Sequence, residues 1–169
     1  MCLGRKMPRR FFKKERIVRH IYSPYSFNEK TNELRHCFLN FVFQEENQKN
    51  ELSCNRLEME TLSHCREVGE HHAQPTSKRN YYGFACTSVD LVTKTPLYSL
   101  LYSPTDKKGI LNYSHSDIYY NIAPIPKGEK GEALAAKLSH DKEIFLKDWL
   151  PYIDREDLIK KKYITPKAS

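Results

Sequence analysis

A histidine and a carboxylate stand two positions apart in this sequence, at His115 and Asp117. They lie in the stretch 110–122, I-L-N-Y-S-H-S-D-I-Y-Y-N-I, which is rich in Ile and Tyr and is bounded by Gly109 and Pro124. This composition predicts a β-strand, on which alternate side chains share a face. The same face would hold Leu111, Tyr113, Tyr119 and Asn121. A carboxylate beside an imidazole can orient the ring and raise its pKa, as general acid–base catalysis requires.

Two more residues would extend this chemistry to a phosphate. Glu51 would supply a second acid or base, and Arg56 would stabilise negative charge. The candidate catalytic residues are therefore His115, Asp117, Glu51 and Arg56. Together with tyrosines that hold bases, they supply the groups of a small metal-independent nuclease. The alternative is that His115 and Asp117 form a satisfied structural pair, because these residue types occur in nearly every domain.

Arg56 also raises a question of burial. The segment 51–59 predicts a strand whose even positions, Leu52, Cys54 and Arg56, share one face. If Arg56 is buried on that otherwise apolar face, it needs a carboxylate, phosphate or carbonyl partner. If the strand ends near Asn55, the guanidinium simply reaches solvent.

Other chemical signatures are weak or absent in the sequence. It contains no G-x-x-x-x-G-K-[ST], G-x-G-x-x-G, H-E-x-x-H or G-x-S-x-G motif. One histidine-rich segment suggests zinc by residue type, but its spacing fits no usual finger or ribbon, and a solvated helix end accounts for it. Its members are His64, Cys65, His71 and His72. The five cysteines are scattered and odd in number, which predicts reduced thiols. We therefore expect neither a metal nor a cofactor.

Strands must position these candidate residues, and the hydrophobic pattern predicts them through most of the chain. The predicted strands are 17–27 (with a turn at Ser23-Pro24), 34–43, 51–59, 81–92, 97–103 and 110–122, the last two as a hairpin. Gly83 marks either a bulge in the fourth of them or a close approach of another backbone. Helices are predicted at 60–69, 129–149 and 154–163. This order predicts an α+β fold, a mainly antiparallel sheet of five or six strands with a mid-chain helix and C-terminal helices.

The net charge of +7 is concentrated at one end of the chain. Residues 1–20 hold eight Lys and Arg residues and one acid, Glu15, so the rest of the chain is neutral. We interpret 1–16 as a flexible basic arm on a single domain, 17–169. Its cations are candidate phosphate contacts, with Arg19 just beyond it, and Phe11 and Phe12 either stack on bases or pin the arm to the core. The candidate contacts are Arg5, Lys6, Arg9, Arg10, Lys13, Lys14, Arg16 and Arg19. Met7 offers a second possible start.

Three short motifs carry a resemblance. The order E-L-S-x-x-R (Glu51–Arg56), Y-Y-G (Tyr81–Gly83) and H-x-D-I (His115–Ile118) resembles a group of small prokaryotic proteins without a known activity. The resemblance covers roughly residues 17–125, and this chain extends further at its C-terminus. It implies one common core that contains Glu51, Arg56, Tyr82, Gly83, His115 and Asp117. It brings no activity, and a role in a prokaryotic defence or toxin system is a hypothesis.

These observations favour a small binding or accessory module. Its neutral domain would dock on a protein partner, and its cationic arm would contact nucleic acid. The alternatives are a nuclease or nucleic-acid-directed toxin that uses the four candidate catalytic residues, and an ADP-ribosyltransferase-like enzyme that uses Arg56 and a carboxylate. No apolar run approaches the roughly 18 residues of a membrane helix, and the basic N-terminus lacks the apolar stretch of a signal peptide. We therefore expect a cytoplasmic protein that does not contact membranes.

Overall fold

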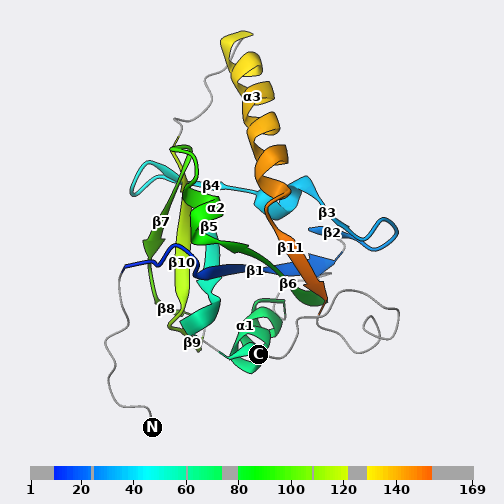
Figure 1. The fold of residues 1–169 in the computed structure, drawn as a ribbon, viewed down its shortest axis with the longest axis vertical. Helices are drawn as coiled ribbons and strands as arrows, with labels where there is room; N and C mark the ends of the chain where they lie inside the picture. Colours follow the sequence, from blue (N-terminus) through cyan, green and yellow to red (C-terminus); the bar gives the residue numbers. More distant parts are fainter. Residues whose placement is uncertain are drawn as a thin grey trace.

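The computed structural model describes residues 10–23, 25–59, 61–73, 80–107, 109–121 and 129–153. A seven-stranded sheet forms its centre, in the order β11-β6-β1-β5-β10-β7, and β4 pairs with β5 beside this path (Figure 1). The strand pairings in this sheet are antiparallel. With a few helices on its two faces, the sheet confirms the predicted α+β class.

The elements follow one another along the chain in this order. They are β1 (Arg16–Ser23), β2 (Phe27–Asn28), β3 (Glu33–Leu34), the 3₁₀ helix η1 (His36–Leu39), β4 (Val42–Gln44), β5 (Lys49–Arg56), η2 (Leu57–Met59), α1 (Leu62–Ala73), β6 (Asn80–Ser88), α2 (Val89–Thr93), β7 (Tyr98–Tyr102), β8 (Thr105–Lys107), β9 (Ile110–Asn112), β10 (His115–Tyr120), α3 (Glu129–Leu146) and β11 (Leu150–Ile153). Two small sheets, β2 with β3 and β8 with β9, complete the described part.

The first strand, β1, lies in the middle of the sheet between β5 and β6 (Figure 1). Its alternation places Ile17 and Ile21 on one face and Val18 on the other, and all three are fully buried. The first face packs against η1, α2 and the C-terminal half of α3, in the larger core. The second face packs against α1 and η2 through Cys65 and Leu57. Both faces of β1 are therefore covered, as its β-branched composition favours.

The strand predicted at 81–92 is correct only in its first part. The register of β1 against β6 shifts where Ile21 faces Gly83 and Tyr22 faces Tyr81, so the predicted bulge at Gly83 is confirmed. Gly83 has φ 143°, a conformation that favours glycine. The strand ends at Ser88 and helix α2 follows, which corrects the prediction. Buried residues no longer alternate there. Val89 and Val92 are both buried, and their spacing of three is that of one helix face.

Two other predicted strands are corrected by the structure. The segment 34–43 is not one strand, because the 3₁₀ helix η1 interrupts it. Its consecutive residues Phe38 and Leu39 are both buried, whereas neighbouring residues of a strand with one covered face would alternate between buried and exposed. Phe38 packs edge-to-face on Trp149, with ring centroids 5.2 Å apart. The stretch 110–122 contains two strands, because the chain turns at Tyr113 and Ser114. The hairpin of β7 with β10 is confirmed, with β8 and β9 at its tip.

The helices differ from their predictions mainly at their ends. Thr61 caps α1, since its hydroxyl accepts a hydrogen bond of 3.1 Å from the backbone N–H of His64. Gly69 lies inside this helix instead of ending it. The position suits glycine because a Cβ there would overlap the ring of Tyr81, which packs closely against the helix. Helix α3 runs without a break from Glu129 to Leu146. The helix predicted at 154–163 lies outside the described residues.

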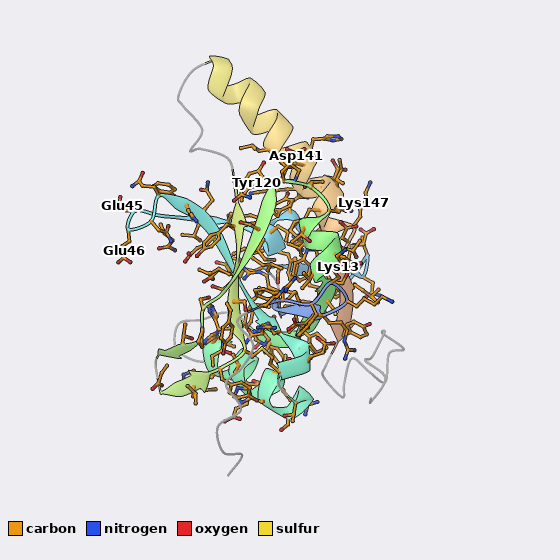
Figure 2. All side chains as sticks on the ribbon, turned by 60° about the vertical axis from the view of Figure 1, so that its left-hand side comes forward. Lys13, Glu45, Glu46, Tyr120, Asp141 and Lys147 are labelled. Carbon is orange, nitrogen blue, oxygen red and sulfur yellow. The ribbon has the colours of Figure 1, made fainter. Side chains whose placement is uncertain are left out.

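The C-terminal half of α3 lies over the larger core. Leu138 and Phe145 of this half and Trp149, just after the helix, are buried. Figure 2 shows Asp141 of this helix close to Tyr120 of β10. Strand β11, which was not predicted from the sequence, follows Trp149 and pairs with β6. Among the described helices, none has the length and hydropathy needed to cross a membrane.

Candidate functional site

The structure brings His115 and Asp117 together on one face of β10. Asp117 lies opposite Ser53 on β5 and is held by hydroxyl groups on both sides. The hydroxyl of Ser103 donates to Oδ2 of Asp117 at 2.6 Å, and that of Ser53 donates to Oδ1 at 3.5 Å. Nε2 of His115 lies 3.8 Å from Oδ1 of the same carboxylate. Asp117 is therefore a nearly buried acid whose oxygens are partnered by neighbouring strands.

Serine, histidine and aspartate meet here, but not in the geometry of a nucleophilic triad. Nδ1 of His115 lies 2.7 Å from the carbonyl oxygen of Ser103, so a proton must sit on that nitrogen and be donated to the carbonyl. The hydroxyl of Ser103, 3.1 Å from the same nitrogen, gives its own proton to Asp117. An activated serine needs an unprotonated imidazole nitrogen facing its hydroxyl. The arrangement therefore orders three strands and does not prepare a nucleophile.

Glu51 shares this face, one step further along the ladder. It lies opposite Tyr119, whereas Asp117 lies opposite Ser53. Burial raises the pKa of Tyr119, and the charges of Asp117 and Glu51 add to that effect. Nζ of Lys49 lies 4.6 Å from the centre of the Tyr119 ring. Three of the four candidate catalytic residues, His115, Asp117 and Glu51, thus lie on one face. None of them is directly opposite another, because Glu51 faces Tyr119 and Asp117 faces Ser53.

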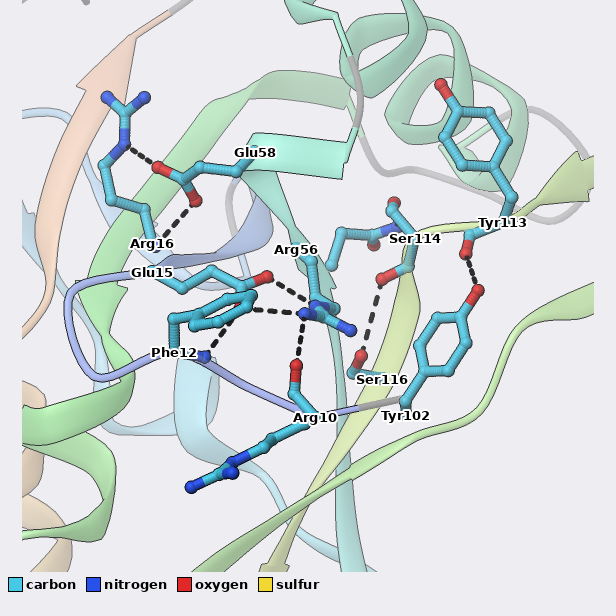
Figure 3. A network of polar contacts seen from close by, with 11 residues as sticks. Arg10, Phe12, Glu15, Arg16, Arg56, Glu58, Tyr102, Tyr113, Ser114 and Ser116 are labelled. Atoms are coloured by element: carbon cyan, nitrogen blue, oxygen red, sulfur yellow. Dashed lines mark hydrogen bonds and ion pairs between the residues drawn. The ribbon is translucent and has the colours of Figure 1, made fainter. Parts of the chain in front are cut away.

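Arg56 points to the other face of the sheet and does not join them. Asn55 is the residue opposite His115, so alternation turns the next side chain away. The guanidinium of Arg56 is bound by Glu15, through Nε to Oε1 and through Nη2 to Oε2 at 2.8 Å (Figure 3). The exposed fractions of the two side chains are only 1% and 4%. The carboxylate partner predicted for a buried Arg56 is confirmed, and the alternative that it reaches solvent is wrong.

The environment of Arg56 extends beyond the carboxylate. Nη2 also donates to the carbonyl oxygen of Arg10 at 3.0 Å. Its guanidinium carbon lies 4.4 Å from the centre of the Phe11 ring and 5.4 Å from that of Tyr102. Sequence reasoning missed Glu15 as the partner, although it is the single acid in the basic segment, a signal that could have identified it.

Glu15 fixes the path of residues 10–15, which we call the basic loop. Its carboxylate accepts a hydrogen bond of 3.1 Å from the backbone N–H of Phe12, and its own N–H donates to the Phe12 carbonyl at 3.0 Å. The first N–H groups of α2 donate to the carbonyls of Glu15 and Lys13, each at 2.9 Å. Phe11 packs on the core, so the described part of the predicted arm lies against the domain.

The cations predicted to contact nucleic acid fall into four groups. Arg10, Lys13 and Lys14 are exposed on the basic loop, beside Phe12, which is 63% exposed. Arg16 forms an ion pair of 2.6 Å with Glu58. The guanidinium of Arg19 is used inside the domain, where it donates to the carbonyls of Phe38 at 2.8 Å and Ser53 at 2.6 Å. Arg5, Lys6 and Arg9 lie outside the described residues.

Thiols and imidazoles offer no reactive pair among the described residues. Nε2 of His20 lies 2.9 Å from the carbonyl of Cys65 and 3.6 Å from its Sγ, between β1 and α1. Burial is the main cause that lowers the pKa of His20 to about 3, so its imidazole is neutral. Burial also raises the pKa of the Cys54 thiol, and that of Cys86 to about 11. In the described part of the chain, no three His, Cys, Asp or Glu side chains converge as metal ligands.

No protein-family model matches the sequence, and no curated protein or solved structure is found to be similar to it.

Proposed function

We propose that this protein is a non-enzymatic binding module that contacts single-stranded nucleic acid through the basic loop. One observation carries the proposal: the buried ion pair of Glu15 with Arg56 holds a loop on which three cations and a phenyl ring are exposed within residues 10–14. Cations that meet phosphates and an aromatic ring that stacks on a base are the two elements of sequence-tolerant single-strand binding.

The fixed path of the loop favours this use. Its backbone is tied at Phe12, Lys13 and Glu15, to itself and to α2. A loop that is ordered before binding loses less conformational entropy when a strand docks on it. Arg10, Phe12, Lys13 and Lys14 would therefore act as one surface, with the domain as its support.

The arrangement of the candidate catalytic residues supports binding over hydrolysis. A metal-independent nuclease needs a cation near the transferred phosphate, and Arg56 lies on the opposite face from His115, bound to a carboxylate. Asp117 is engaged by two serine hydroxyls, and His115 donates to a backbone carbonyl. These contacts stabilise the sheet and leave the nuclease without its cation.

Fluorescence anisotropy with labelled single-stranded RNA and DNA of about twelve nucleotides tests the proposal. Replacing Lys13 and Lys14 by Gln should weaken binding and reduce the slope of log K against log salt by roughly 0.7 for each phosphate that is no longer neutralised. Phe12→Ala should weaken binding by about 1–3 kcal/mol, because the base would have no ring on which to stack. Lys30→Gln is the matched control, because Lys30 is an exposed lysine in the turn between β2 and β3.

Two outcomes would contradict the proposal. If the lysine variants keep the wild-type affinity and salt slope, the basic loop is not the contact surface. If the oligonucleotide is cleaved and His115→Ala abolishes cleavage without changing the unfolding curve, the nuclease alternative replaces this proposal.

A further inference from the structure

A groove between α2 and α3 is the second feature of the molecule that points to a ligand. Helix α3 contributes Asp141, Ile144, Phe145 and Asp148, which recur at the spacing of one helix face. Leu91, Lys94 and Thr95 of α2 and the segment that follows it form the opposite wall. The open cavity measures about 120 Å³. For comparison, a protein cavity of about 150 Å³ holds a benzene molecule, so the groove is suited to an apolar group about the size of one aromatic ring.

The walls of the groove are apolar, and two of the side chains that form them are left exposed. Leu91 is 37% exposed and Ile144 is 46% exposed, on opposite rims. Between them the rings of Tyr98 and Phe145 stack, with centroids 4.2 Å apart. An apolar body that enters the groove would cover both aliphatic rims and would contact this aromatic floor.

Two polar atoms at the groove lack hydrogen-bond partners within the described part of the chain. The hydroxyl of Tyr98 and Oδ2 of Asp141 are both buried and unpartnered, and the side chain of Tyr98 is 94% buried, since only 6% of its surface is exposed. Burial raises the pKa of Tyr98, and the negative charges of Asp141 and Asp148 add to the shift. Burial raises the pKa of Tyr120 to about 12, and the charge of Asp141 and a polar contact between the two side chains add to the shift. Oδ2 of Asp141 still has no donor at hydrogen-bond distance, so a ligand that brings a charged donor can satisfy it.

The charges around the groove decide whether that donor should be neutral or cationic. At one end, Nζ of Lys94 pairs with Asp148 at 2.5 Å, so these two charges compensate each other. At the other end, Asp141 has no ion-pair partner among the residues whose side chains the structure describes, so its charge is not paired there as that of Asp148 is. A cationic donor matches this end, whereas an anion would be repelled.

We propose that this groove binds a small organic ammonium ion. Its apolar body, of about one ring, lies between Leu91 and Ile144 on the Tyr98–Phe145 stack. Its ammonium group donates to Asp141, and the hydroxyl of Tyr98 gains a neighbour with which it can hydrogen-bond. The proposal rests on the groove alone and does not depend on nucleic-acid binding by the basic loop.

Isothermal titration calorimetry of the full chain near neutral pH, with three probes of similar size, tests this proposal. Phenethylammonium should bind at least about tenfold more tightly than phenethyl alcohol, because a hydrogen bond to a charged group contributes more than a neutral one. Phenylacetate should not bind. Asp141→Asn should remove the preference for the ammonium probe, and Ile144→Trp, a change on the exposed rim, should block the probe by filling the groove.

Glu143→Gln is the matched control, because Glu143 is an exposed acid on the same helix that does not line the groove. It should bind phenethylammonium as the wild type does. The proposal is overturned if the alcohol binds as tightly as the ammonium, if Asp141→Asn keeps the preference, or if none of the probes binds. The last result would mean that water alone hydrogen-bonds to the Tyr98 hydroxyl and to Oδ2 of Asp141.

Discussion

Replacing Glu15 by Gln removes the counter-charge of Arg56 but keeps the shape of the side chain. The guanidinium would then stay buried, at 1% exposure, with the neutral carbonyls of Gln and of Arg10 as its acceptors. Breaking a buried ion pair in this way typically destabilises a protein by about 3–5 kcal/mol. For a domain of this size, that corresponds to a melting temperature lower by roughly 6–20 °C.

A double-mutant cycle separates the buried charge from the packing. Arg56→Met alone leaves the carboxylate of Glu15 buried, and it also removes the contacts of the guanidinium with the rings of Phe11 and Tyr102. The double variant Glu15→Gln with Arg56→Met buries no charge, so it should be more stable than either single variant. The coupling between the two positions should be about 2 kcal/mol or more, measured by urea unfolding with a common m-value.

The chain contains a matched control for this cycle. Arg16 and Glu58 form an ion pair of the same type, but their side chains are 49% and 41% exposed. Glu58→Gln should therefore change the free energy of unfolding by less than about 1 kcal/mol. If Glu15→Gln and Glu58→Gln destabilise the protein equally, burial does not govern these pairs and the reasoning is refuted.

Two further predictions concern the packing of α1 against β1 and β6. Gly69→Ala should destabilise the fold by about 1–2 kcal/mol in urea unfolding, because the new Cβ would lie 2.6 Å from Cδ2 of Tyr81 and 2.9 Å from Cδ2 of His20, an overlap that outweighs the better helix propensity of Ala. Ser63→Ala on the exposed side of α1 is its control, and equal stability of the two variants would contradict the clash. The pKa of His20 is about 3 in the folded state, so protons bind more readily to the unfolded chain below about pH 6.5, and stability should fall by about 2 kcal/mol between about pH 7 and pH 5. His20→Gln should lose that part of the pH dependence; an unchanged slope would mean that His20 is protonated in the folded protein.

Local patterns in the sequence were sufficient for much of the fold. Helix α3, the bulge at Gly83 and the antiparallel hairpin of β7 with β10 each depend on residues that are close in sequence. The aromatic run 34–43 was wrongly predicted as a strand because Phe38 and Leu39 are apolar in any conformation, and only their packing under α3 selects the 3₁₀ turn.

The candidate site depended on information that is not local. The alternation rule placed His115 and Asp117 on one face correctly, but Ser103 joins them only through the register of β7 against β10. Alternation along one strand already separates Arg56 from Glu51, but which of the two faces His115 follows only from the register of β5 against β10, which puts Asn55 opposite His115. Glu15 is brought to Arg56 by a loop, for which no periodicity exists.

The central place of β1 has a consequence for the nascent chain. Its two neighbours, β5 at 49–56 and β6 at 80–88, both follow it in the sequence, so both of its hydrogen-bonding edges stay unpaired until those segments have left the ribosome. An unpaired strand with apolar residues on both faces is a template for association with other chains. Arg16 and Arg19 interrupt this strand with positive charges that repel a second copy. We therefore expect the two arginines, which bind Glu58 and the backbone of η1 in the finished domain, also to oppose association of the strand during translation.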